Sequence, residues 1–186
     1  MESDLIERAA QGDGDAYDAL VGQHQDAVFR LAYLITGDPD DADDVAQETF
    51  IRAHRHLHRF DRTRPFRPWL LRIARNLARN RQRAAGRYLA ALQRAFLMAP
   101  RAAASAEAEH AQRWEVQALW DAIRELNPQD QEIIYLRYML ELSVEETADA
   151  LDIAPGTVKS RLSRALGRLR GIAQEHFPLL VEGWQP

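Results

Sequence analysis

The stretch SVEETADALDIAPGTVKSRLSR, residues 143–164, decides the fold of the C-terminal part of this chain. Ser143 precedes an apolar-patterned segment and Glu146 follows three residues later, which is the spacing of an N-terminal capping box. A helix is therefore expected to begin there. After a short turn, Pro155 is well placed to open a second helix. The stretch predicts a helix-turn-helix unit.

The second helix of this unit has two different sides. Apolar residues recur on one side at helical spacing, while basic and hydroxyl-bearing residues occupy the rest. A basic helix is often only a solvated surface, but the cap, the turn and the apolar spacing together favour a helix that enters the major groove of DNA. The basic and hydroxyl-bearing residues of this helix are Lys159, Ser160, Arg161, Ser163 and Arg164.

A second basic segment lies upstream, between residues 59 and 83, and combines arginines with aromatic residues. Positions three and four residues apart form a single helical face. This face, called the arginine stripe below, carries Arg72, Arg75, Asn76, Arg79, Asn80 and Arg83. An unpaired DNA strand needs cations for its phosphates and stacking surfaces for its bases, and Phe66 and Trp69 precede the stripe. The two aromatic residues also fit ordinary core positions.

The net charge of −4 hides a strong segregation of charge along the chain. Residues 1–51 hold thirteen acids and two arginines, whereas residues 52–94 hold thirteen arginines and one acid. The order repeats, because residues 107–152 are mainly acidic and residues 153–172 carry five basic side chains and no acid. Basic segments suit nucleic acid and acidic segments suit a protein partner. The two kinds of segment can also mask each other in the free protein.

Composition excludes several classes of function. The chain has no cysteine, which removes disulfide frameworks, thiolate metal sites and thiol nucleophiles. No apolar run approaches the roughly 20 residues that span a bilayer, and the N-terminus lacks the pattern of a secretory signal, so we expect a soluble, cytoplasmic protein without a cofactor. An enzyme hypothesis would start from His54 and His58, four residues apart, as metal ligands. The remaining histidines are scattered, and we expect neither a metal nor catalysis.

Helical spacing recurs almost throughout, and strand patterns are scarce. We therefore expect an all-α protein of two small helical domains joined by a linker. The expected parts are a first domain at 1–90 with about four helices, a linker at 91–112, a second domain at 113–175 and a tail at 176–186. Within the second domain, helices are expected at 114–126, 129–140, 144–151 and 157–172.

The motifs resemble the sigma-70 family of RNA polymerase sigma factors, specifically its extracytoplasmic-function group, over nearly the whole chain. LITGD at 34–38, DDVAQETF at 43–50, RPFRPWL at 64–70 and RIARN at 72–76 resemble the family's region two. LNP at 126–128, LRY at 136–138, ETA at 146–148 and GTVKSRL at 156–162 resemble region four. The second set alone resembles other helix-turn-helix regulators, but the ordered pair is specific.

The resemblance implies roles for individual residues. In region two, the acidic helix would dock on the clamp of the polymerase β′ subunit through Asp43, Asp44, Gln47 and Glu48, unless this is only a solvated acidic face. The following loop and helix would bind the melted non-template strand of the minus 10 element through Phe66, Trp69, Arg72, Arg75, Asn76, Arg79 and Asn80. In region four, the minus 35 duplex would be read by a set of residues called the recognition face below, with Arg137 as a phosphate contact. The recognition face comprises Thr157, Lys159, Ser160, Arg161 and Arg164.

The implied partners are the RNA polymerase core, promoter DNA and an anti-sigma factor, and no appended regulatory domain is expected after residue 175. Two positions depart from the family pattern: His54 stands where an aromatic residue is common, and Asp152 stands where glycine is frequent. Asp tolerates left-handed backbone, so the turn is expected to survive. The alternative function is a transcription regulator that binds duplex operators through the helix-turn-helix alone, which leaves the arginine stripe unexplained.

Overall fold

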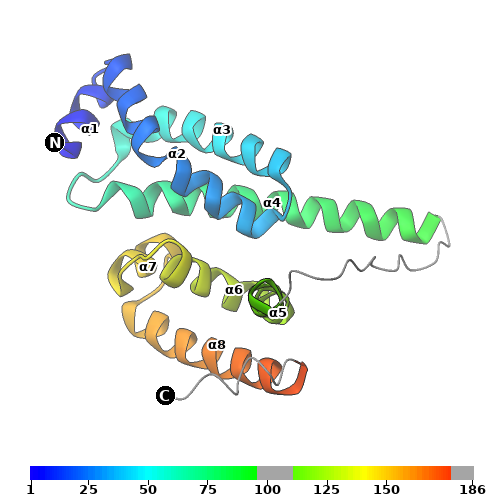
Figure 1. The fold of residues 1–186 in the computed structure, drawn as a ribbon. Helices are drawn as coiled ribbons and strands as arrows, with labels where there is room; N and C mark the ends of the chain where they lie inside the picture. Colours follow the sequence, from blue (N-terminus) through cyan, green and yellow to red (C-terminus); the bar gives the residue numbers. More distant parts are fainter. Residues whose placement is uncertain (96–110, 177–186) are drawn as a thin grey trace.

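The computed structural model describes residues 1–95 and 111–176, and within these ranges it contains helices and no strand. The helices form two bundles, which Figure 1 shows one above the other. The all-α prediction is therefore confirmed. The segment 96–110, which makes up most of the expected linker, and residues 177–186 of the expected tail lie outside the described residues.

The first bundle contains α1 (Glu2–Ala10), α2 (Gly14–Thr36), α3 (Pro39–His56), a short 3₁₀ turn η1 (Leu57–Arg59) and α4 (Phe66–Ala95). In the turn between α2 and α3, Gly37 ends α2 with φ 74° and the side chain of Asp38 caps α3. Buried leucines from α2 and α4 fill the core. α4 continues as a helix to Ala95, beyond the expected domain boundary at residue 90.

The second bundle contains α5 (Ala111–Glu125), α6 (Pro128–Ile134), a π-helical turn η2 (Tyr135–Met139), α7 (Val144–Leu151) and α8 (Pro155–His176). The sequence predicted a single helix over residues 129–140. Instead, α6 ends at Ile134 and the chain widens into η2, where the amide of Leu140 donates to the carbonyl of Tyr135, 3.0 Å away. This wider turn leads into the loop before α7.

The helix-turn-helix unit forms as its sequence predicts. Ser143 Oγ accepts from the amide of Glu146 at 3.0 Å, and Glu146 Oε2 accepts from the amide of Ser143 at 2.8 Å, which completes the capping box. Asp152 ends α7 in the left-handed region with φ 59°. α7 and α8 follow each other across this turn and pack together.

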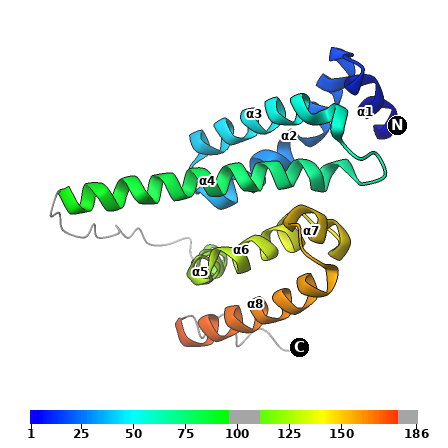
Figure 2. The same ribbon diagram turned by 180° about the vertical axis from the view of Figure 1, so that it is seen from behind.

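The two bundles are in contact, and α4 lies against α7 in both views of the molecule (Figures 1 and 2). α2 also touches η2. The side of α4 that faces the second bundle carries the arginine stripe, so the fold brings the most basic helix of the first bundle against the acidic part of the second.

Candidate nucleic-acid interfaces

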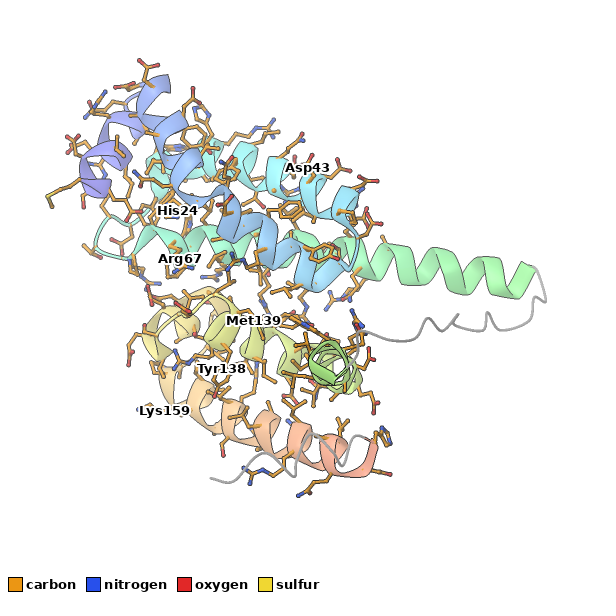
Figure 3. All side chains as sticks on the ribbon, viewed as in Figure 1. His24, Asp43, Arg67, Tyr138, Met139 and Lys159 are labelled. Carbon is orange, nitrogen blue, oxygen red and sulfur yellow. The ribbon has the colours of Figure 1, made fainter. Side chains whose placement is uncertain are left out.

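The recognition face lies on the N-terminal half of α8. Val158, Ala165 and Leu169 are buried and anchor α8 to the rest of the bundle. Lys159, Ser160 and Arg164 are exposed, whereas Thr157 and Arg161 are partly exposed. Figure 3 shows Lys159 pointing away from the protein. All five expected DNA contacts on α8 are therefore at least partly exposed, as residues of a helix that enters a major groove must be.

Arg137, the further phosphate contact that the resemblance implied, does not belong to this surface. Its Nη1 donates to the carbonyl of Leu142, and its Nε is buried without a hydrogen-bond partner among the residues that the structure describes. The guanidinium closes the loop after η2. Arg137 is partly exposed, and its contact with a phosphate stays a prediction.

The arginine stripe lies on α4, as the three-and-four spacing predicts, but Arg72, Arg75 and Arg79 are paired with carboxylates. Asn76, Asn80 and Arg83 are exposed, while Arg72, Arg75 and Arg79 are partly buried because the second bundle covers them. Their partners are carboxylates of that bundle, and Glu132 of α6 is the most deeply buried of these.

Two arginines of the stripe share Glu132. Arg75 Nε donates to Glu132 Oε2 at 2.8 Å, and Arg79 Nε lies 3.1 Å from Glu132 Oε1. Glu132 Oε1 is buried and accepts no hydrogen bond from any described residue, so the second contact is an ion pair with poor hydrogen-bond geometry. The side chains of Glu132 and Arg75 are 4% and 12% exposed. Burial of this kind strengthens the mutual attraction, but it also removes both charges from water.

Three further contacts surround this central pair. Arg72 Nη2 donates to the carboxylate of Asp152, at the end of α7. Arg67 Nη2 donates to the carbonyl of Leu140 at 2.9 Å, and Figure 3 shows Arg67 between the two bundles. Arg64 lies 3.7 Å from Asp149 of α7. The three arginines of the candidate surface for an unpaired DNA strand are thus paired with groups of the same chain, whereas Asn76 and Asn80 stay exposed.

The aromatic residues ahead of the stripe occupy two different environments. Phe66 is only 2% exposed and packs against the rings of Phe60, Trp69 and His24, with centroid distances of 5.5, 5.5 and 5.3 Å. It is a core residue of the first bundle, so it cannot stack on a base without leaving the core. Trp69 is partly exposed and rests on Phe60 at 4.9 Å.

The acidic helix is α3, and its charged face is exposed. Figure 3 shows Asp43 on the side of the molecule away from the second bundle. Asp43 accepts from Gln47 Nε2 at 2.7 Å, and Glu48 pairs with Arg52 at 2.6 Å. Asp44 pairs with Arg81 of α4 at 2.7 Å. The four expected docking residues therefore share an accessible surface that the second bundle does not cover.

The structure also contains two features that sequence reasoning missed. A pocket of about 480 Å³ between the bundles is lined by Arg79 from α4 and by Arg161, Arg164 and Arg168 from α8. Arg168 pairs with the buried Asp130 at 2.6 Å. An apolar groove of about 540 Å³ lies between α5, η2 and α8, with Leu119 and Tyr138 exposed at its edge. Both depend on tertiary packing, which local sequence patterns do not encode.

The histidines of the metal hypothesis do not form a site within residues 1–95 and 111–176, where no three histidine, aspartate or glutamate side chains gather as metal ligands would. The ring of His54 instead contacts Tyr17 edge-on, with centroids 4.7 Å apart. His54 stands where an aromatic residue is common in the family, and its ring still packs against the neighbouring helix through this contact. In the same ranges, none of the helices is both long enough and apolar enough to cross a membrane.

Comparison with known proteins identifies both bundles. The family model of sigma-70 region 2 matches residues 20–88, and that of sigma-70 region 4 matches residues 116–169. The extracytoplasmic-function (ECF) RNA polymerase sigma factor BldN of Streptomyces coelicolor is 37% identical over 89% of this chain, and the match covers 64% of BldN. The ECF sigma factor SigW of Bacillus subtilis is 32% identical, and the match covers 89% of this chain and 92% of SigW.

A solved structure has the same arrangement of helices. The sigma factor RpoE from Bartonella quintana, solved in complex with the anti-sigma factor NepR, aligns with 85% of this chain and 96% of its own, with a TM-score of 0.65 and 25% identity. The similarity extends over both bundles.

Proposed function

We propose a division of labour between the two bundles of this chain, which belongs to the extracytoplasmic-function group of the sigma-70 family of RNA polymerase sigma factors. The polymerase core would supply the chemistry, while this chain would recognise the promoter and bind the first unpaired bases. One observation carries the proposal: a region-2 bundle with a basic helix and a region-4 bundle with an exposed recognition face follow each other in one chain.

The second bundle would read the minus 35 duplex through the recognition face. Arg161 and Lys159 are the side chains suited to guanine edges and phosphates, and Thr157 and Ser160 to either. The exposure of this surface supports the assignment. Arg137 would act indirectly, by holding the loop before α7 through Leu142.

The first bundle would capture the unpaired strand of the minus 10 element. Trp69 would offer a stacking surface, Arg72, Arg75 and Arg79 would bind phosphates, and Asn76 and Asn80 would reach bases. Phe66 would contribute indirectly, because its buried ring packs against Trp69 and supports the stacking surface. The alignment of these side chains along α4 supports the assignment, although the arginines must first leave their carboxylate partners.

Two protein partners follow from family membership. The exposed face of Asp43, Asp44, Gln47 and Glu48 on α3 would dock on the β′ clamp of the polymerase core, since it is acidic and free of the second bundle. An anti-sigma factor would restrain the protein, in line with the complex of RpoE with NepR. An activity on the polymerase core would place the chain in the cytoplasm, and it requires no catalytic group of its own.

Run-off transcription with sigma-free polymerase core tests this proposal. A library of promoter fragments is transcribed with and without the protein, and only initiation is scored. Discrete start sites that depend on the protein are the expected result, and the selected fragments then reveal the promoter. Binding to duplex DNA without any initiation would instead support the operator-binding regulator.

A further inference from the structure

The apolar groove between α5, η2 and α8 has no role in the proposed contacts with DNA. We propose that its occupant is the C-terminal segment of the same chain, residues 177–186, which follows α8 in sequence and lies outside the described residues. The segment would turn back along α8 and pack its apolar side chains into the groove. This inference goes beyond the proposed function, because it concerns neither DNA surface.

The first step of the argument concerns the groove itself. Its volume is about 540 Å³. Between residues 116 and 176, the exposed large hydrophobic side chains are those of Val116, Leu119 and Tyr138. Leu119 and Tyr138 line the groove, and Val116 lies one helical turn before Leu119 on α5. Apolar side chains that gather at one place, instead of lying scattered, mark a surface that another segment covers.

The second step concerns the composition of the C-terminal segment. Its sequence is FPLLVEGWQP, and half of its residues are large and apolar, namely Phe177, Leu179, Leu180, Val181 and Trp184. Such side chains are stabilised by leaving water. A mainly apolar groove beside α8 offers them burial without a second molecule.

The third step concerns charge. Glu182 is the one charged side chain of the segment. Among the described residues that line the groove, Arg170 of α8 is the one charged side chain. Arg170 is exposed and forms no ion pair with another described residue. An apolar segment with a single acid therefore complements an apolar groove with a single arginine.

The fourth step concerns reach. His176 ends α8, and its Nδ1 lies 3.0 Å from Oε1 of Glu125, which ends α5. The segment therefore starts beside two of the elements that form the groove. Gly167 lines the groove nine residues before His176, which is about 14 Å along a helix, whereas ten extended residues span up to about 33 Å. Pro178 has no amide to continue a helix, so the sequence favours a change of direction there.

The proposed contact would leave the recognition face accessible. Ser163 and Gly167 of α8 line the groove, whereas Ser160 and Arg164 belong to the recognition face and do not line it. Binding of duplex DNA should therefore not depend on the segment. A helix of a protein partner, in contrast, could enter the groove only by displacing the segment.

The rate of cysteine labelling in the full-length chain tests this proposal. Because the chain has no cysteine, Ser163→Cys places a single thiol at the groove, and Ser160→Cys places one on the same helix outside it. Both serines are exposed, so the two variants form a matched pair. Each is prepared with the native segment and with a polar segment that carries Leu179→Ser, Leu180→Ser and Val181→Ser. The reaction with a maleimide is followed under native conditions.

We expect the polar segment to raise the labelling rate of Ser163→Cys on the order of tenfold, because the thiol would react mainly while the segment is out of the groove. The rate of Ser160→Cys should stay unchanged. Loss of apolar burial should also lower the melting temperature by on the order of 5 °C. A synthetic peptide of residues 177–186, added to the chain with the polar segment, should slow the labelling of Ser163→Cys again.

Equal labelling of Ser163→Cys with the native and the polar segment would overturn the proposal. A rise of the same size in Ser160→Cys would also contradict it, since the substitutions would then loosen α8 as a whole. Protection that appears only as the protein concentration rises would assign the groove to a second copy of the chain, against a contact within one chain. Circular dichroism checks that every variant remains helical.

Discussion

The arginine stripe of α4 and the recognition face of α8 are both basic helical surfaces with DNA as their proposed partner, yet they differ in what they contact. Arg75 is partly buried against Glu132 of the other bundle, while Lys159 is exposed. Glu132 and Asp152, which pair with the stripe, belong to an acidic segment. This segment lies more than fifty residues C-terminal to the arginines that it pairs with. Local composition therefore indicates what a surface can bind, and tertiary packing decides whether it is available.

The largest effect is expected when the second bundle, which covers the arginine stripe, is destabilised. Leu136 of η2 is fully buried, and Leu136→Ala should destabilise the second bundle by about 2–5 kcal/mol because it leaves a cavity in its core. We expect loss of duplex binding together with improved binding of single strands to α4. Urea unfolding followed by circular dichroism, with DNA binding measured in parallel, checks this. Loss of both binding activities would show that the two surfaces do not act independently.

Substitutions on α8 and on α4 should affect different steps of promoter binding. Arg161→Ala should weaken binding to a minus 35 duplex by about 1–3 kcal/mol, the range for a well-placed base contact. Asn80→Ala should leave duplex binding unchanged and impair promoter opening, because Asn80 lies on α4. Fluorescence anisotropy and permanganate footprinting measure the two effects. Equal losses of duplex binding from both substitutions would contradict the assignment.

A smaller effect is expected from the N-terminal cap of α7, the helix that packs against α4. Ser143→Ala removes the side chain that accepts from the amide of Glu146, which should destabilise the second bundle by about 1 kcal/mol. α7 carries Asp149 and is followed by Asp152, so its fraying should slightly increase binding of single strands. Ser143→Asp is the control, since aspartate also caps helices well. A thermal shift as large in the control as in Ser143→Ala would argue against the cap.

Sequence alone could predict the helices, the capping box and the left-handed Asp152, because each depends on residues within a few positions. It could also place the stripe on one helical face. It could not predict that Glu132 lies between Arg75 and Arg79, or that Phe66 is buried while Trp69 is partly exposed. These facts depend on contacts between distant segments. The end of α6 at Ile134 was missed for a related reason, since the π turn has no clear sequence signal.

The smallest effect is expected at the edge of the interface, where Arg64 and Asp149 lie 3.7 Å apart with side chains 61% and 38% exposed. An exposed pair at this distance contributes about 0–1 kcal/mol, because water screens it and both side chains lose freedom. Asp149→Asn should therefore leave binding of a labelled single-stranded DNA pool, measured by fluorescence anisotropy, nearly unchanged, although it removes the same charge as Glu132→Gln. If Asp149→Asn strengthened this binding as much as Glu132→Gln does, net charge rather than the buried contact at Glu132 would keep the stripe covered.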